Sequence, residues 1–154
     1  MLLLAFMARW TYYGGSWRFM IALILTYMLR LLLVSLFKMR SPSEDLWEFP
    51  GFPSLTVQYG NRNDYYFNPV PAICIQLFCE YREQGPRVLM WLSLLALVAS
   101  CYLSLCLRGH YSIDNFGGLV MGHYIWLASN NWLCYFVDVK LFGMTLHERF
   151  PNML

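Results

Sequence analysis

Apolar residues along this chain fall into four runs, separated by polar stretches rich in turn-forming residues. The first run, 18–37, and the third, 87–107, are each long enough to cross about 30 Å of hydrocarbon as a helix. The second, 66–81, is short, and the last, 115–137, contains two asparagines. The pattern predicts an all-α, polytopic membrane protein with about four transmembrane helices.

A long polar segment, 38–65, separates the first run from the second. Its helix-breaking residues are Pro42, Pro50, Gly51, Pro53 and Gly60. Because prolines and glycines favour turns, this segment is predicted to be a structured interfacial loop and not a span. With no internal repeat or low-complexity stretch, residues 1–154 are predicted to form a single membrane domain.

The composition agrees with a membrane protein. The chain is 58% hydrophobic and 13% charged, whereas soluble domains average roughly 45–50% and about 25%. A net charge of +2 with scattered basic residues gives no surface for nucleic acid. The five cysteines lie in or beside apolar runs, without CxxC or zinc-ligand spacing, so neither a metal nor a cofactor is expected.

Polar residues inside the apolar runs indicate contacts with protein. Arg30 interrupts the first run, and it is predicted either to face protein or to snorkel towards the interface beside Lys38. Asn130 and Asn131 make the last run less apolar, which indicates that one face of that helix meets protein.

Two further groups of residues have simple structural interpretations. Small residues on the last run predict a close helix-packing face, formed by Gly117, Gly118 and Gly122. Aromatic residues near the N-terminus predict a belt at the membrane interface, formed by Trp10, Tyr12, Tyr13 and Trp17.

The segment CLRGHYSIDNFGGLVMGHYIW, at 106–126, places His110 and Asp114 four residues apart. Residues at this spacing share one face of a helix, so the two side chains are predicted to hydrogen-bond. A carboxylate on one ring nitrogen fixes the tautomer and leaves the other nitrogen as a base or nucleophile. By spacing alone, a structural polar pair at the interface is the commoner explanation.

The residues around this pair resemble a known motif. RGHYSIDNFGGLVMGHY is similar to the C-terminal histidine motif of the type 2 phosphatidic acid phosphatase superfamily, in particular of phosphatidylcholine:diacylglycerol cholinephosphotransferases and, next, sphingomyelin synthases. WEFPGFPSLTVQYGNRNDYYF resembles the loop before the family's other histidine motif. The resemblance implies that His110 matches a histidine that attacks phosphorus, that Asp114 matches the acid that orients it, and that a second histidine protonates the departing oxygen.

That second histidine is missing. In the family it lies in a Ser-Gly-His triplet after an aromatic pair; aligned on Tyr66–Phe67, the triplet becomes Asn68, Pro69 and Val70. Val70 cannot donate a proton, and the loss of a positioned acid typically costs about 10²–10⁴-fold in rate. Asn68 and Pro69 instead predict a helix start, with a side-chain cap followed by proline at the first helical position.

No other histidine can replace it. The chain has none before His110, and His123 lies 13 residues further along the predicted helix, about 20 Å away. His147 lies in the tail, on the side predicted to be opposite. Family members have six spans, as the resemblance implies, whereas this chain has room for about four.

Two functions follow as expectations. The favoured one is a catalytically inactive relative that serves as a structural or accessory subunit of a larger membrane complex, with other membrane subunits and phospholipids as partners. Its residual site of Arg62, Arg108 and His110 would bind lipid phosphate, although Arg108 is equally explained as a helix-end cation at headgroup level. The alternative is an active lipid phosphotransferase or phosphatase, with His110 as nucleophile and an acid supplied from elsewhere.

The compartment is predicted from the same considerations. The family resemblance implies the endoplasmic reticulum or Golgi. The first acidic residue is Glu44, so the N-terminal segment carries only positive charge. Mitochondrial targeting segments share that bias, and with the accessory-subunit interpretation it favours the mitochondrial inner membrane.

Overall fold

The structure is a computed structural model that describes residues 2–13, 17–37, 67–84, 86–107, 110–130, 134, 136–141 and 143. Within these residues the regular structure is entirely helical. The elements are α1 (Leu2–Tyr13), α2 (Arg18–Leu36), α3 (Pro69–Gln84), α4 (Arg87–Cys106), α5 (Ser112–Ala128) and a short π-helix (Phe136–Leu141). The predicted loop at 38–65 lies outside the described residues.

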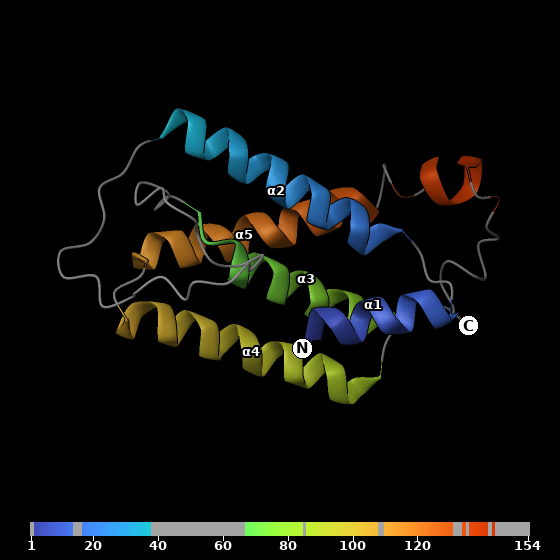
Figure 1. The fold of residues 1–154 in the computed structure, drawn as a ribbon, viewed down its shortest axis with the longest axis horizontal. Coiled ribbons are helices and arrows are strands. Elements are labelled where there is room, and N and C mark those ends of the chain that lie inside the picture. Colours follow the sequence, from blue (N-terminus) through green and yellow to red (C-terminus); the bar gives the residue numbers. More distant parts are fainter. Residues whose placement is uncertain are drawn as a thin grey trace.

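Helices α2 to α5 run alternately up and down along the long axis of the molecule (Figure 1). α3 is the central helix, since it packs against α2, α4 and α5. The starts of α2 and α4 therefore share one end of the bundle with the ends of α3 and α5. We call this the α2-start end, and the opposite end, where α3 and α5 begin, the α5-start end.

The two longest helices confirm the clearest predictions. The runs at 18–37 and 87–107 correspond to Arg18–Leu36 and Arg87–Cys106. Both helices are long and apolar enough to cross a membrane.

The second apolar run corresponds to α3, which starts where Asn68 and Pro69 predicted and ends later than the run. A span at 66–81 was expected, but α3 begins at Pro69 and continues to Gln84. Phe67 lies before the helix with its side chain buried. In the last turns of the helix, Glu80 and Glu83 both pair with Arg18 of α2.

The last helix is also displaced from the predicted span at 115–137. α5 covers Ser112–Ala128, and its first turn is capped by Asp114, whose Oδ2 accepts a hydrogen bond from the backbone N–H of Tyr111 at 2.9 Å. Residues 129–130 have wider, π-helical hydrogen bonding. The π-helix at Phe136–Leu141 is a separate element.

The N-terminal helix α1 was not predicted. It packs across the α2-start end through Phe6, whose ring lies 4.3 Å from that of Phe19, centre to centre. Both join a small buried core with Ile73, Leu77 and Tyr81. The side chains of Trp10, Tyr12 and Tyr13 lie outside the described part, so the predicted aromatic belt stays a prediction.

Two glycines confirm the predicted packing face between α5 and α3. A Cβ atom at Gly122 would lie 2.6 Å from the Cα of Ala72, and one at Gly118 would overlap the backbone carbonyl oxygen of Asn68. Both obstacles are backbone atoms, which cannot move aside as a flexible side chain can. The absence of a side chain at both positions therefore sets the separation of the two helices.

The outer surfaces of the long helices are apolar. Large exposed side chains on α2 and α4 include Met28, Leu31, Trp91, Leu95 and Val98. Buried positions, in contrast, hold polar and charged residues, which are Arg18, Thr26, Asn68, Gln76, Glu80, Ser93, Asp114, Asn115 and Ser129. The interior therefore mixes these polar groups with apolar core residues such as Phe19, Leu77 and Tyr81, while the outer faces of the long helices are apolar.

Candidate functional site

Asn68 joins the starts of α3 and α5. Its Oδ1 accepts a hydrogen bond from the backbone N–H of Val70 at 3.0 Å, and its Nδ2 donates to Oδ1 of Asn115 at 2.8 Å. Its own backbone N–H donates to the carbonyl oxygen of Asp114 at 3.3 Å. The predicted helix start, with Asn68 as the cap and Pro69 as the first helical residue, is confirmed.

The same network reaches α4 through Ser104. Nδ2 of Asn115 donates to Oγ of Ser104 at 2.8 Å, and the Ser104 hydroxyl in turn donates to the carbonyl oxygen of Cys101 at 2.9 Å. Three helices therefore meet at one buried set of neutral hydrogen bonds. Such groups stabilise a bundle only when nearly all of them have partners, as they do here.

His110 and Asp114 lie close together, but not as predicted. They do not share a face of a helix, because α5 begins at Ser112 and His110 precedes it. Nδ1 of His110 lies 3.5 Å from Oδ2 of Asp114, which is longer than an ordinary hydrogen bond. Oδ2 is instead bonded to the backbone of Tyr111, because a carboxylate near a helix start is drawn to the unpaired N–H groups there.

The carboxylate of Asp114 is fully buried, whereas the side chain of His110 is 17% exposed. Oδ1 of Asp114 has no hydrogen-bond partner among the described residues. The pair thus combines a buried anion with an imidazole that reaches the surface. This geometry still allows the carboxylate to orient the ring.

Among the other predicted site residues, only Asn68, Pro69 and Val70 are described. Val70, which the expected resemblance aligns with a second histidine, is half-buried on the first turn of α3. Arg62 and Arg108, the predicted phosphate ligands, lie outside the described residues. The described residues hold no group of three or more His, Cys, Asp or Glu side chains that could bind a metal ion.

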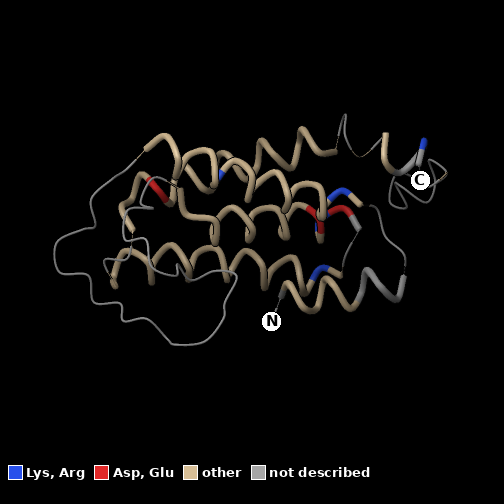
Figure 2. The backbone as a smooth tube through the Cα atoms, turned by 45° about the horizontal axis from the view of Figure 1, so that its top comes forward, with Lys and Arg blue, Asp and Glu red and all other residues tan. Residues whose placement is uncertain are grey.

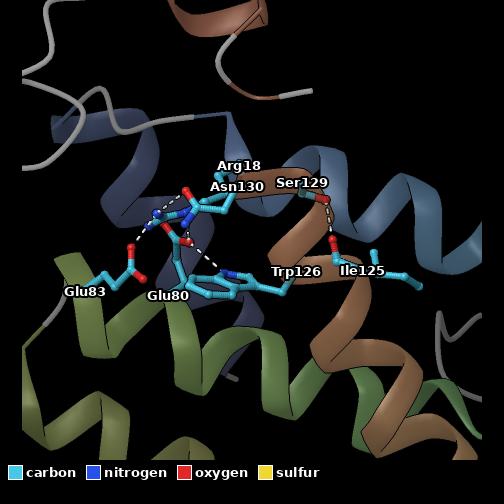
Figure 3. A network of polar contacts seen from close by, with 7 residues as sticks. All are labelled: Arg18, Glu80, Glu83, Ile125, Trp126, Ser129 and Asn130. Carbon is cyan, nitrogen blue, oxygen red and sulfur yellow. Dashed lines mark hydrogen bonds and ion pairs between the residues drawn. The ribbon is translucent and has the colours of Figure 1, made fainter. Parts of the chain in front are cut away.

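A second polar cluster, which sequence reasoning missed, lies at the α2-start end (Figure 3). Its centre is Arg18, which is 1% exposed. The Nε of Arg18 donates to Oε2 of Glu80 at 2.8 Å, and its Nη1 pairs with Glu83 and donates to Oδ1 of Asn130 at 3.1 Å. Its guanidinium lies 5.1 Å from the ring of Trp126, whose Nε1 donates to Glu80 at 3.3 Å.

We call Arg18, Glu80, Glu83, Trp126 and Asn130 the arginine cluster. Figure 2 shows that most of the charged residues in the described helices gather at this end of the bundle. An arginine at the start of an apolar run is typical of an ordinary helix-end cation, so the pattern did not predict a buried ion pair. The one available signal was Glu80, an acid directly after an otherwise apolar segment.

The arginine cluster bears on one prediction. The last run was predicted to meet protein at its asparagines, and the side chain of Asn130 does so by contacting Arg18 of α2 in the same chain. Arg30 is half-buried, a position that fits either of its two predicted roles. Asn131 lies outside the described residues.

Between the two ends, Gln76 connects α3 with α2 and α5. Its Nε2 donates to Oγ1 of Thr26 at 2.7 Å and to the carbonyl oxygen of Gly122 at 3.3 Å. The side chains of Gln76 and Thr26 are fully buried. Asn68, Gln76 and Glu80 thus bring a polar group to the α3 interfaces at both ends and in the middle.

No protein-family model, no curated protein and no solved structure matches this chain. The expected resemblance to membrane lipid phosphotransferases therefore rests on the motif residues alone.

Proposed function

We propose that this protein is a polytopic membrane protein, without phosphotransfer activity of its own, that serves as a structural subunit of a larger membrane assembly. The observation that carries the proposal is that residues at the positions expected to be catalytic make structural hydrogen bonds. Asn68 caps α3 and binds Asn115, and Asp114 caps α5. Side chains held in helix caps and buried hydrogen bonds are parts of a scaffold.

Membrane crossing is supported by the distribution of side chains. Helices α2 and α4 satisfy the length and apolarity of a span, and their outer faces are apolar. We propose that α3 and α5, which are packed beside them, cross as well and give four spans. The buried hydrogen bonds of Gln76 and Asn68 then lie where a membrane bundle needs them, between helices.

Loss of activity is supported by the chemistry that α3 can offer. A leaving oxygen needs a proton, and Val70 provides an alkyl side chain in place of an imidazole. Pro69 has no backbone N–H with which to bind a phosphate oxygen. The site therefore has the nucleophile and its orienting acid without the second half of the reaction.

The residual site suits a bound phospholipid. His110 reaches the surface at the α5-start end, and Arg62 and Arg108 are expected near the same headgroup level. We propose that a lipid phosphate binds there without turnover and fills the interface with a neighbouring subunit. For the compartment we favour the mitochondrial inner membrane, because of the acid-free N-terminal segment, with the endoplasmic reticulum or Golgi as the alternative.

The first test is the native mass of the protein after mild detergent extraction, with mass spectrometry of the proteins that co-migrate. Co-migration with a large stoichiometric assembly is the expected result, and it would identify the compartment. A free monomer would contradict the structural role in an assembly.

The second test addresses activity. Because His110 has no catalytic task in this proposal, His110→Ala should leave cellular lipid turnover unchanged. Restoring the triplet with Asn68→Ser, Pro69→Gly and Val70→His should likewise produce no phosphotransfer from a labelled phospholipid. Lipid turnover that disappears in His110→Ala would contradict the proposal.

The alternative function is an active lipid phosphotransferase or phosphatase with His110 as nucleophile. One observation favours it: Oδ2 of Asp114 lies 3.5 Å from Nδ1 of His110, a separation that a small shift of the ring would close to a hydrogen bond. That enzyme needs a proton donor from water or from another chain. Purified protein that transfers labelled phosphate, and loses this activity in His110→Ala, would establish it.

A further inference from the structure

The start of α5 holds a buried acceptor without a partner. Oδ2 of Asp114 accepts a hydrogen bond from the backbone N–H of Tyr111 at 2.9 Å, whereas Oδ1 has no partner among the described residues. The side chain is fully buried, and the one described ionisable group within 4.0 Å of it is His110, whose Nδ1 lies 3.5 Å from Oδ2. A carboxylate oxygen that has lost both water and a hydrogen bond is costly to keep.

The missing partner must be a donor, because an ionised carboxylate can only accept hydrogen bonds. The neighbouring amides are engaged elsewhere. Nδ2 of Asn68 donates to Asn115, and Nδ2 of Asn115 donates to Ser104. The buried network of the three helices therefore does not supply the donor for Oδ1 of Asp114.

Two open donors lie in the same helical turn. The N–H groups of Ser112 and Ile113 precede the first intrahelical bond of α5, and no partner for them is found among the described residues. Both residues are exposed. N–H groups at a helix start bind phosphate oxygens. The start of α5 therefore combines exposed donors that suit an anion with a buried acceptor that suits a cation with N–H groups.

We propose that this site binds a phosphoethanolamine headgroup, as carried by phosphatidylethanolamine. Its phosphate accepts hydrogen bonds from the N–H groups of Ser112 and Ile113, beside the imidazole of His110. Its primary ammonium group donates to Oδ1 of Asp114. The inference rests on the lipid-phosphate binding proposed above and names the headgroup, but it does not depend on the loss of activity.

The hydrogen-bond requirement of Asp114 selects a primary amine over choline. Both headgroups carry one positive charge, so both are attracted to a carboxylate. The quaternary ammonium of choline has no N–H, however, and leaves Oδ1 unpaired. His110 leaves a route to this oxygen, because its side chain is 17% exposed and its distance from Asp114 is too long for a hydrogen bond that would fix the ring there.

The experiment is a methylation series of short-chain lipids that displace a fluorescent phospholipid from the purified chain in detergent. The series is phosphatidylethanolamine, its N-methyl and N,N-dimethyl derivatives, and phosphatidylcholine, which share one charge but lose one amine N–H at each step. We expect the last step, which removes the final N–H, to weaken binding about ten- to hundredfold. Equal affinity for all four lipids would overturn amine recognition and leave the phosphate site standing. No binding of any of them would overturn the lipid site itself, and the headgroup with it.

Two variants separate the amine from the phosphate. Asp114→Asn keeps an acceptor for the N–H of Tyr111 but removes the charge, so the preference for phosphatidylethanolamine over phosphatidylcholine should disappear. Ser112→Pro removes one N–H at the first helical position, which proline suits after the extended backbone of Tyr111. It should weaken all four lipids alike. With melting temperatures showing that both variants fold, a preference that survives in Asp114→Asn would overturn the role of the carboxylate, and undiminished binding in Ser112→Pro would overturn the phosphate contact.

Discussion

Arg18 lies between two carboxylates, an amide and an indole, with 1% of its surface exposed. An ion pair at such depth loses the hydration of both charges, and its net contribution to stability depends on the remaining hydrogen bonds. Here Trp126 and Asn130 provide them. Removing one of the two charges is therefore expected to cost more stability than the intact pair contributes.

Arg18→Met should lower the free energy of unfolding by about 3–5 kcal/mol, because it leaves the buried Glu80 without its counter-charge. Thermal unfolding in mild detergent measures this. The matched control is Arg82→Met, which removes an exposed arginine at the same end of the bundle and should change stability by less than about 0.5 kcal/mol. Equal melting temperatures of the wild type and Arg18→Met would show that the arginine cluster contributes nothing to stability.

Gly122→Ala tests the close approach of α5 to α3. The added methyl group meets the backbone and Cβ of Ala72 at 2.6–2.9 Å, so the helices must separate, at a cost of about 1–3 kcal/mol. Ala128→Val, at an exposed position of the same helix, should cost less than about 0.5 kcal/mol. A melting temperature that is unchanged in Gly122→Ala would contradict the contact.

At the scale of elements, the starts of α3 and α4 differ in how they are capped. α3 begins with a side-chain cap from Asn68, whereas α4 begins after Pro86 without one. The N-terminal N–H groups of a helix have no partner within it, so a cap holds the first turn in place. The capped start of α3 can therefore be compared with the uncapped start of α4 within one molecule.

Asn68→Ala should cost about 0.5–2 kcal/mol through the lost cap and should speed hydrogen exchange in the first turn of α3. Asn68→Ser keeps a capping oxygen and should show a smaller change. Exchange at the start of α4, measured in the same mass-spectrometric experiment, serves as the internal control. Faster exchange at both helix starts would indicate general destabilisation and not the loss of a cap.

At the scale of the whole molecule, the question is which solvent meets the apolar outer faces. Val98 lies near the middle of α4 and is 59% exposed. In water, an exposed valine can be replaced by a charged residue at little cost. In hydrocarbon, the same replacement is costly.

Val98→Arg should therefore disfavour membrane insertion by about 2.5–3.5 kcal/mol, the value for arginine at the centre of a span. Val88→Arg, at the end of the same helix, should be tolerated because its side chain can reach the interface. The measurement is the fraction of protein retained in the membrane pellet. Full retention of both variants would show that the middle of α4 faces water or protein and not lipid.

The sequence by itself determined the features that depend on neighbouring residues. Continuous apolar runs located α2 and α4 to within a residue, because the length of a span is fixed by the hydrocarbon it crosses. Asn68 and Pro69 identified the start of α3, since capping acts over a few residues. Gly118 and Gly122 similarly indicated a packing face before any partner helix was known.

Only the tertiary structure decided which polar groups meet. Arg18 and Glu80 are 62 residues apart, and Arg18 and Asn130 are 112 residues apart, so their contact depends on the docking of three helices. The same docking makes α3 the central helix, although it is not the most apolar.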